Sequence, residues 1–146
     1  MKKFSALWVI LIVVFCPGCS GLHSGSGKSS LFLENTDWRL VEIRGKEILA
    51  MPGKMVPYLR LISDEGRVVG HGGCNRFFGG YKAEGDHLRF SALGSTKMAC
   101  PGDTGDLEAA LFNALGSVER FKLSGEVLEL FGDRELLARF RSVNGM

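Results

Sequence analysis

Short segments that alternate apolar and polar residues, separated by a few turn residues, constrain the fold of this chain most strongly. Such alternation over five to eight residues indicates strands with one buried face, and Gly- and Asp-containing links between them favour hairpins. Near the C-terminus, three of these segments predict an antiparallel meander, at residues 120–124, 127–131 and 135–141. Further strands are expected upstream, at residues 37–44, 58–63, 67–71 and 87–91.

One segment has helical spacing instead. Residues 106–115 (DLEAALFNAL) place apolar side chains at intervals of three and four, which predicts an amphipathic helix. We expect Asp103 or Thr104 to cap its start, Gly116 to cap its end, and Asp106 and Glu108 to suit the positive end of its dipole. Because a sheet with one apolar face must curl or be covered, we predict a mainly β domain. Its single curved antiparallel sheet closes into a small barrel-like domain with one amphipathic helix.

The centre of the chain is rich in glycine. Residues 70–81 (GHGGCNRFFGGY) predict a tight, bulged crossover, because glycine permits positive φ and close backbone approach. Asn75 is expected to bond to nearby backbone, and Phe77, Phe78 and Tyr81 to fill the space that the glycines leave. A ligand-binding loop is the alternative interpretation.

Together with residues 95–100 (STKMAC), Trp38 and the strand containing Leu128 and Leu130, this segment resembles the META/HslJ-like domain family, over about residues 35–140. The family motif is carried by Gly73, Cys74, Asn75, Arg76, Phe77, Gly80, Tyr81, Thr96, Met98 and Cys100. The resemblance implies a curved, barrel-like β-structure with one helix, and an association with envelope stress and antibiotic tolerance. It implies no catalytic residues. The family fold is also similar to that of pilotin lipoproteins, which assist secretin assembly.

The first nineteen residues predict export. Lys2 and Lys3 precede an apolar run at residues 6–15, which is shorter than the roughly 20 residues that cross a bilayer. We predict a lipoprotein-type signal peptide at residues 1–18, with lipid attached to Cys19. Cys16 and Pro17 depart from the usual lipoprotein pattern, so plain secretion with cleavage near Ser20, or a retained helix, are the alternatives.

Residues 19–30 then form the lipidated N-terminus and a flexible Gly/Ser-rich linker, and residues 31–146 form the META/HslJ-like domain. The domain is expected to face the periplasm, with the outer membrane favoured because Ser20, and not Asp, follows the lipidated residue. A soluble periplasmic protein is the alternative.

Cysteine content predicts a disulfide. Of the four cysteines, Cys16 leaves with the signal and Cys19 takes the lipid, so Cys74 and Cys100 remain as a pair in an oxidising compartment. A bond between them closes a loop of about 27 residues and stabilises the fold by about 3–4 kcal/mol. The alternative is two free buried thiols.

Metal and catalytic sites are weakly supported. A zinc site could be drawn from His71, Cys74, His87 and Cys100, but their spacing does not form two ligand clusters. Cys100 could act as a nucleophile only with a histidine that some other group orients, and the sequence offers no such group. We therefore expect no cofactor, no metal and no enzymatic activity.

Charge limits the classes of partner. Lys2 and Lys3 account for the formal net charge of +2, which leaves 16 basic and 16 acidic side chains in the rest of the chain. We see no basic run that could bind nucleic acid. We expect a monomer held at the membrane by lipid, with an unknown envelope protein as partner.

The expected role is interaction or structural support in envelope stress or outer-membrane homeostasis. The alternatives are a small apolar ligand or lipid in a barrel mouth, and a pilotin-like assembly factor. The candidate contact loop is residues 48–55 (ILAMPGKM), unless it folds onto the end of the barrel.

Overall fold

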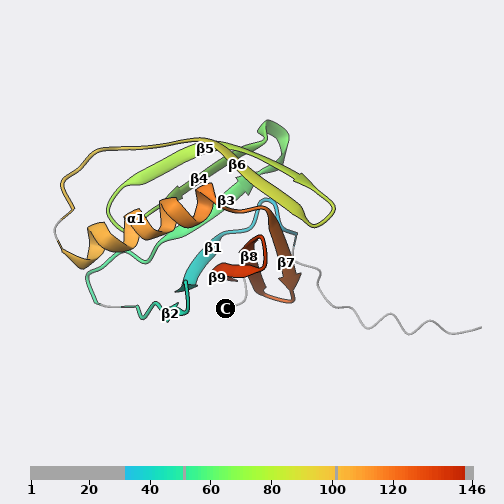
Figure 1. The fold of residues 1–146 in the computed structure, drawn as a ribbon. Coiled ribbons are helices and arrows are strands. Elements are labelled where there is room, and N and C mark those ends of the chain that lie inside the picture. The colour runs from blue at the N-terminus through green and yellow to red at the C-terminus, as the bar shows by residue number, and fades with distance from the viewer. Residues whose placement is uncertain (1–31, 51, 101, 144–146) are drawn as a thin grey trace, which may run out of the picture.

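The computed structural model describes residues 32–50, 52–100 and 102–143. The predicted signal peptide, Cys19 and the linker lie outside these residues. Nine strands form one antiparallel sheet, and a single α-helix lies against it (Figure 1). The elements are β1 Trp38–Ile43, β2 Lys46–Glu47, β3 Tyr58–Ile62, the 3-10 turn Ser63–Glu65, β4 Arg67–His71, β5 Arg76–Glu84, β6 His87–Ser95, α1 Asp103–Gly116, β7 Arg120–Ser124, β8 Val127–Gly132 and β9 Glu135–Ser142. Within this part of the chain, no helix combines the length and apolar character needed to cross a membrane.

The sheet closes into a ring. Its order is β2-β1-β3-β4-β5-β6-β7-β8-β9, and β1 also pairs with β9. The ring is uneven, because β6 meets β7 through the single residue pair His87–Arg120, whereas β1 pairs with β9 along most of its length. Helix α1 contacts β6, β9 and β1 and so covers the opening between the diverging strands. The predicted curved sheet with one helix is confirmed, as a closed ring and not a regular barrel.

The core lies between the ring and the helix, as the alternation of the strands predicts. Inward-facing side chains of the strands are fully buried, and α1 adds Leu111, Ala114 and Leu115 from its apolar stripe. The largest buried side chains of the strands are Trp38, Leu40, Leu59, Leu61, Val68, Phe77, Leu88, Leu128, Leu130 and Phe140. Burial of this apolar surface is the main favourable contribution to folding.

The glycine-rich centre differs from the prediction. The crossover is confined to the four residues before Arg76, and β5 then continues as a strand to Glu84. The glycines serve close packing within the sheet: a Cβ on Gly79 would lie 2.9 Å from Leu93 Cδ2. The β-bulge lies not in β5 but in its neighbour β6, where Ala92 adopts a φ of 49°. Phe78 was expected to fill space inside, but it points outward and is 55% exposed.

The helix also begins differently from the prediction. It starts at Asp103, and its N-cap is Gly102, with no side-chain cap from Asp103 or Thr104. Gly102 has a φ of 57°, a conformation that glycine adopts without penalty. At the other end Gly116 is still helical, and Ser117 is the C-cap. The predicted caps are therefore wrong at both ends, although the apolar stripe is placed correctly.

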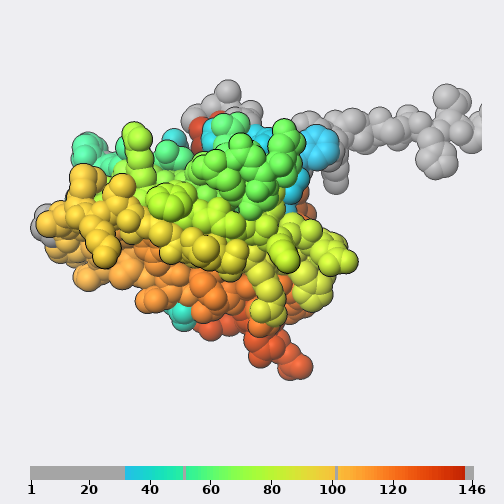
Figure 2. Space-filling view, turned by 90° about the horizontal axis from the view of Figure 1, so that it is seen from above, coloured from blue at the N-terminus to red at the C-terminus, as the bar shows by residue number. Residues whose placement is uncertain are grey.

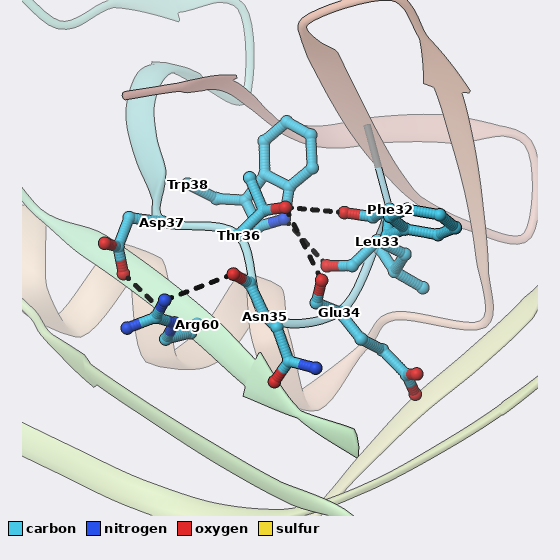
Figure 3. A network of polar contacts seen from close by, with 8 residues as sticks. All are labelled: Phe32, Leu33, Glu34, Asn35, Thr36, Asp37, Trp38 and Arg60. Atoms are coloured by element: carbon cyan, nitrogen blue, oxygen red, sulfur yellow. Dashed lines mark hydrogen bonds and ion pairs between the residues drawn. The ribbon is translucent and has the colours of Figure 1, made fainter. Parts of the chain in front are cut away.

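The described chain enters the ring through residues 32–37, which we call the N-terminal clasp (Figure 3). Within it, the Thr36 hydroxyl donates to the Phe32 carbonyl at 2.7 Å, and the Trp38 indole N–H donates to the Leu33 carbonyl at 2.9 Å. Arg60 of β3 donates to the Asn35 carbonyl and forms an ion pair with Asp37 at 3.5 Å. These contacts fix the clasp against the sheet.

The clasp marks one end of the molecule. It is bonded to the last part of β3, where Asn35 N–H donates to the Leu61 carbonyl at 2.7 Å. It also reaches the middle of β5, where the Tyr81 hydroxyl donates to Glu34 at 2.5 Å. Burial and this contact with Glu34 raise the pKa of Tyr81 well above its usual value. In the space-filling view, the clasp and the teal segment that joins β2 to β3 lie toward opposite ends (Figure 2).

Candidate functional site

The family-motif residues converge on a disulfide. Cys74, in the turn between β4 and β5, is bonded to Cys100, which comes just before α1, with an S–S distance of 2.06 Å. The predicted pairing is confirmed, and the alternative of two free thiols is wrong for this structure. The bond ties the turn of residues 72–75 to the start of the helix.

Asn75 organises the polar contacts beside the disulfide. Its side chain is 4% exposed, and its amide N–H donates to Glu108 Oε1 at 2.7 Å. Its carbonyl oxygen accepts from the Thr96 hydroxyl and from the Met98 backbone N–H, both at 2.8 Å. Asn75 therefore joins the turn, the segment that follows β6 and the helix in one network.

Glu108 is the buried carboxylate of this network. Only 8% of it is exposed, and Oε2 accepts from the backbone N–H of Asn75 at 2.6 Å and of Cys74 at 3.3 Å. A Cβ on Gly72 would lie 2.5 Å from the same oxygen, so only glycine leaves room for the carboxylate. Burial alone would raise the pKa of Glu108. The hydrogen bonds from Asn75 and Cys74 outweigh burial and hold that pKa below its ordinary value.

The helix dipole, expected from the sequence to be the role of Glu108, is only part of what its carboxylate does. The carboxylate does lie in the first turns of α1, but it points into the protein on the same stripe as Leu111 and Leu115. Positions three and seven residues apart share a helix face. An acidic residue on an otherwise apolar helical stripe is the sequence signal that could have identified Glu108 as a buried carboxylate.

We expect Glu108→Gln to weaken the acid-side pH dependence of the free energy of unfolding. Because the folded-state pKa of Glu108 lies below its ordinary value of 4.5, its stabilising contribution is present above that pH. It is lost as the pH falls through the folded-state pKa. The amide cannot ionise, so the variant should lose less stability than the wild type between neutral and acidic pH. Urea titrations across this range measure the difference.

Glu84→Gln is the matched control for this experiment, because Glu84 is exposed and makes no ion pair with another described residue. It should keep the wild-type pH profile. At neutral pH, Glu108→Gln should also cost about 1–3 kcal/mol, since the new amide group faces backbone donors. An unchanged acid-side slope in Glu108→Gln would show that the carboxylate is not stabilised by the network.

The other motif residues have separate positions. Gly73 lies in the disulfide turn, Phe77 and Tyr81 are buried along β5, and Gly80 packs against Ser91. Arg76 and Met98 are exposed. The structure thus gathers Cys74, Asn75, Thr96 and Cys100 into one network, together with the backbone of Met98, and places Arg76, Phe77, Gly80 and Tyr81 along β5.

The zinc arrangement considered from the sequence is not assembled. Both cysteines are in the disulfide, and His71 Nδ1 accepts a hydrogen bond from the Gly73 N–H at 3.1 Å. His87 lies at the start of β6, beside Asp86, whereas the disulfide network lies beyond the other end of that strand. In the described ranges, no group of three or more potential ligand side chains is placed to hold a metal ion.

A groove of about 530 Å³ lies next to the disulfide network. The predicted contact loop forms one wall and the first turns of α1 form the other. The lining residues are Ile43, Lys46, Glu47, Ile48, Leu49, Lys54, Met55, Val56, Pro57, Asp103, Thr104, Asp106, Leu107 and Ala110. Leu49 and Met55 remain 69% and 56% exposed at its edge.

The disulfide turn supports this groove. A Cβ placed on Gly73 would lie 3.6 Å from both Pro57 Cγ and Thr104 Cγ2, one from each wall. The turn therefore lies against both walls. The sequence indicated the loop, but the opposite wall required the placement of α1.

Comparison with known proteins agrees with this fold. Residues 31–144 match the META domain family. The chain belongs to the META domain family. A protein from Burkholderia xenovorans, solved by NMR, is similar over 97% of this chain and 98% of its own, with 25% identity and a TM-score of 0.61. A second NMR structure is similar in fold over 74% of this META-domain chain and 90% of its own, with 21% identity and a TM-score of 0.59. No curated protein matches the chain.

Proposed function

We propose that this META-domain protein is a non-catalytic binding domain of the cell envelope, tethered through lipid on Cys19, and that its groove holds an apolar segment of a partner protein. The groove is the observation on which this proposal depends. Its volume of about 530 Å³ lies within the range of ligand sites in proteins. Its floor is aliphatic, with Ile43, Leu107 and Ala110 among the lining residues.

The rim of the groove favours a polypeptide over a fatty acid. Lys46 and Lys54 lie on the wall formed by β2 and the loop, and Asp103 and Asp106 lie on the helix wall. A fatty acid presents one negative headgroup, whereas a polypeptide presents charges of both signs and backbone hydrogen-bonding groups. An apolar centre with a polar rim is also the usual composition of protein–protein interfaces.

The envelope location rests on the sequence. The charged start, the apolar run and Cys19 predict export and lipidation, and the outer membrane is favoured by Ser20. The Cys74–Cys100 disulfide supports this location, because such bonds persist in oxidising compartments and are rare in the bacterial cytoplasm. A role in envelope stress or outer-membrane homeostasis follows from the family resemblance.

Site-specific photo-crosslinking of the full-length protein in intact cells tests the groove. A photoreactive residue at Ile48, which lines the groove, should give a discrete adduct whose partner peptide, identified by mass spectrometry, is apolar. Leu49→Ser together with Met55→Ser should lower the yield about thirtyfold, because each side chain loses on the order of 1 kcal/mol of apolar burial.

Phe78→Ser is the matched control, since Phe78 is comparably exposed and is not among the groove residues. It should leave the crosslinking yield within about twofold of the wild type. A lipid adduct at Ile48 would instead assign the groove to an acyl chain, and no adduct would contradict a binding role. A secretin as the captured partner would specify a pilotin-like function.

A further inference from the structure

A row of cationic and aromatic side chains crosses the outer face of the ring. It contains Arg141 of β9, Arg39 of β1, Tyr58 of β3, His71 of β4 and Arg76 of β5, and we call it the arginine row. Each residue is directly opposite the next across the sheet. Opposed residues of antiparallel strands point to the same face. Since Trp38 and Leu40 are buried, Arg39 and the rest of the row point outward.

The arginines of this row make no ion pair or side-chain hydrogen bond with another residue of the described ranges. Elsewhere in the described ranges, arginine side chains make ion pairs or hydrogen bonds, as Arg44, Arg60, Arg67, Arg89, Arg120 and Arg139 do. The arginines without such a contact to a described residue are Arg39, Arg76, Arg141 and, in the exposed turn before β9, Arg134.

The strand register makes the arginine row electrostatically unfavourable when no anionic partner is bound. Arg39 and Arg141 are directly opposite each other, and like charges in opposed positions are destabilising. The adjacent row on the same face is different: Arg139 is bonded to Glu42 of β1 and, at 2.9 Å, to Glu129 of β8. The same strands can therefore supply carboxylates. Near the arginine row, the Asp37 carboxylate is already engaged in its ion pair with Arg60.

We propose that the arginine row binds an acidic stretch of polypeptide, continuous with the apolar segment that the groove holds. This inference rests on the proposed function of the groove. The two surfaces adjoin, because Tyr58 directly follows Pro57, which lines the groove. The turn that joins His71 to Arg76 also approaches both groove walls at Gly73.

The shape of the row favours a polypeptide over an anionic membrane. The row follows the curve of the ring across five strands, which a flexible chain can follow and a flat bilayer cannot. The Tyr58 and His71 rings, stacked with centroids 6.3 Å apart, add a rigid surface between Arg39 and Arg76.

Binding of poly-L-glutamate to the chain from Ser20 to Met146 tests the proposal. This chain keeps every strand, the helix and the disulfide. The triple variant Arg39→Gln, Arg76→Gln and Arg141→Gln should bind the polymer about tenfold more weakly at low ionic strength, and added salt should reduce wild-type binding. The matched control changes Lys82, Lys122 and Arg134 to glutamine, which removes the same charge outside the row, and should retain binding within about twofold.

Further measurements separate the arginine row from the groove and from membrane binding. The triple arginine variant should unfold at no lower urea concentration than the wild type, because the removed guanidinium groups repel one another. Leu49→Ser with Met55→Ser should leave polyglutamate binding unchanged, so failure of the groove and failure of the row are distinguishable. Equal loss of binding in both charge variants would overturn the proposal. So would row-dependent binding to phosphatidylglycerol vesicles without binding to polyglutamate, which would assign the row to the membrane.

Discussion

Replacing Cys74 and Cys100 together by alanine should lower the free energy of unfolding by about 3.5 kcal/mol. The two residues are 26 positions apart, and the bond removes the conformational freedom of that loop from the unfolded chain. The closed loop contains β5 and β6, which meet β7 through a single residue pair. On its β7 side, this part of the ring therefore has little other reinforcement from the sheet. Urea unfolding of the double variant and of the oxidised wild type gives the difference directly.

The reduced wild-type protein is the control for the double variant. Its two thiols restore the original side-chain volume without the bond, so its stability should lie within about 1 kcal/mol of the alanine variant. A small residual difference is expected from the Asn75 amide, whose N–H lies 3.1 Å from Cys100 Sγ. A double variant as stable as the oxidised protein would mean that the unfolded chain is already restricted without the bond.

Local patterns predicted much of this fold. The strand at residues 67–71 and the strand at 120–124 are found with the expected bounds, because alternation and turn residues are properties of neighbouring positions. The turn at Asp64-Glu65-Gly66 is present, with Gly66 at a φ of 58°. The disulfide also followed from the sequence, since the predicted signal peptide and lipidation site would leave a single pair of cysteines.

The remaining features depend on contacts between distant segments. Residues 76–84 contain two adjacent glycines and do not alternate cleanly, so β5 is a strand because β4 and β6 pair with it on both sides. Glu108 is tolerated in the interior because a turn more than thirty residues upstream supplies its donors. The arginine row is assembled from residues 39 to 141 by strand register alone, so no window of sequence shows a basic cluster.

Asn75→Ala should lower the free energy of unfolding by about 3 kcal/mol, although it deletes only a short side chain. The variant leaves the Met98 N–H and the Thr96 hydroxyl without their acceptor, and removes a donor from Glu108. Each buried polar group that loses its partner costs about 1–3 kcal/mol, and water entering at the partly exposed segment recovers part of this. Urea unfolding at neutral pH measures the loss. Asn113→Ala, at an exposed position on the same domain, should change stability by less than about 0.5 kcal/mol.

Asn75→Asp separates the loss of hydrogen bonds from the loss of volume, because it preserves the shape of the side chain. At neutral pH it places a second carboxylate 2.7 Å from Glu108 Oε1, where the amide previously donated, so the loss should equal or exceed that of Asn75→Ala. Burial and the Glu108 charge both raise the pKa of the new carboxyl group. As the pH falls through that pKa, the group becomes protonated and can donate to Glu108 again. The stability deficit of Asn75→Asp relative to the wild type should therefore shrink on mild acidification, whereas the deficit of Asn75→Ala should not. A deficit that stays constant with pH would mean that the donor to Glu108 is not what stabilises this corner of the domain.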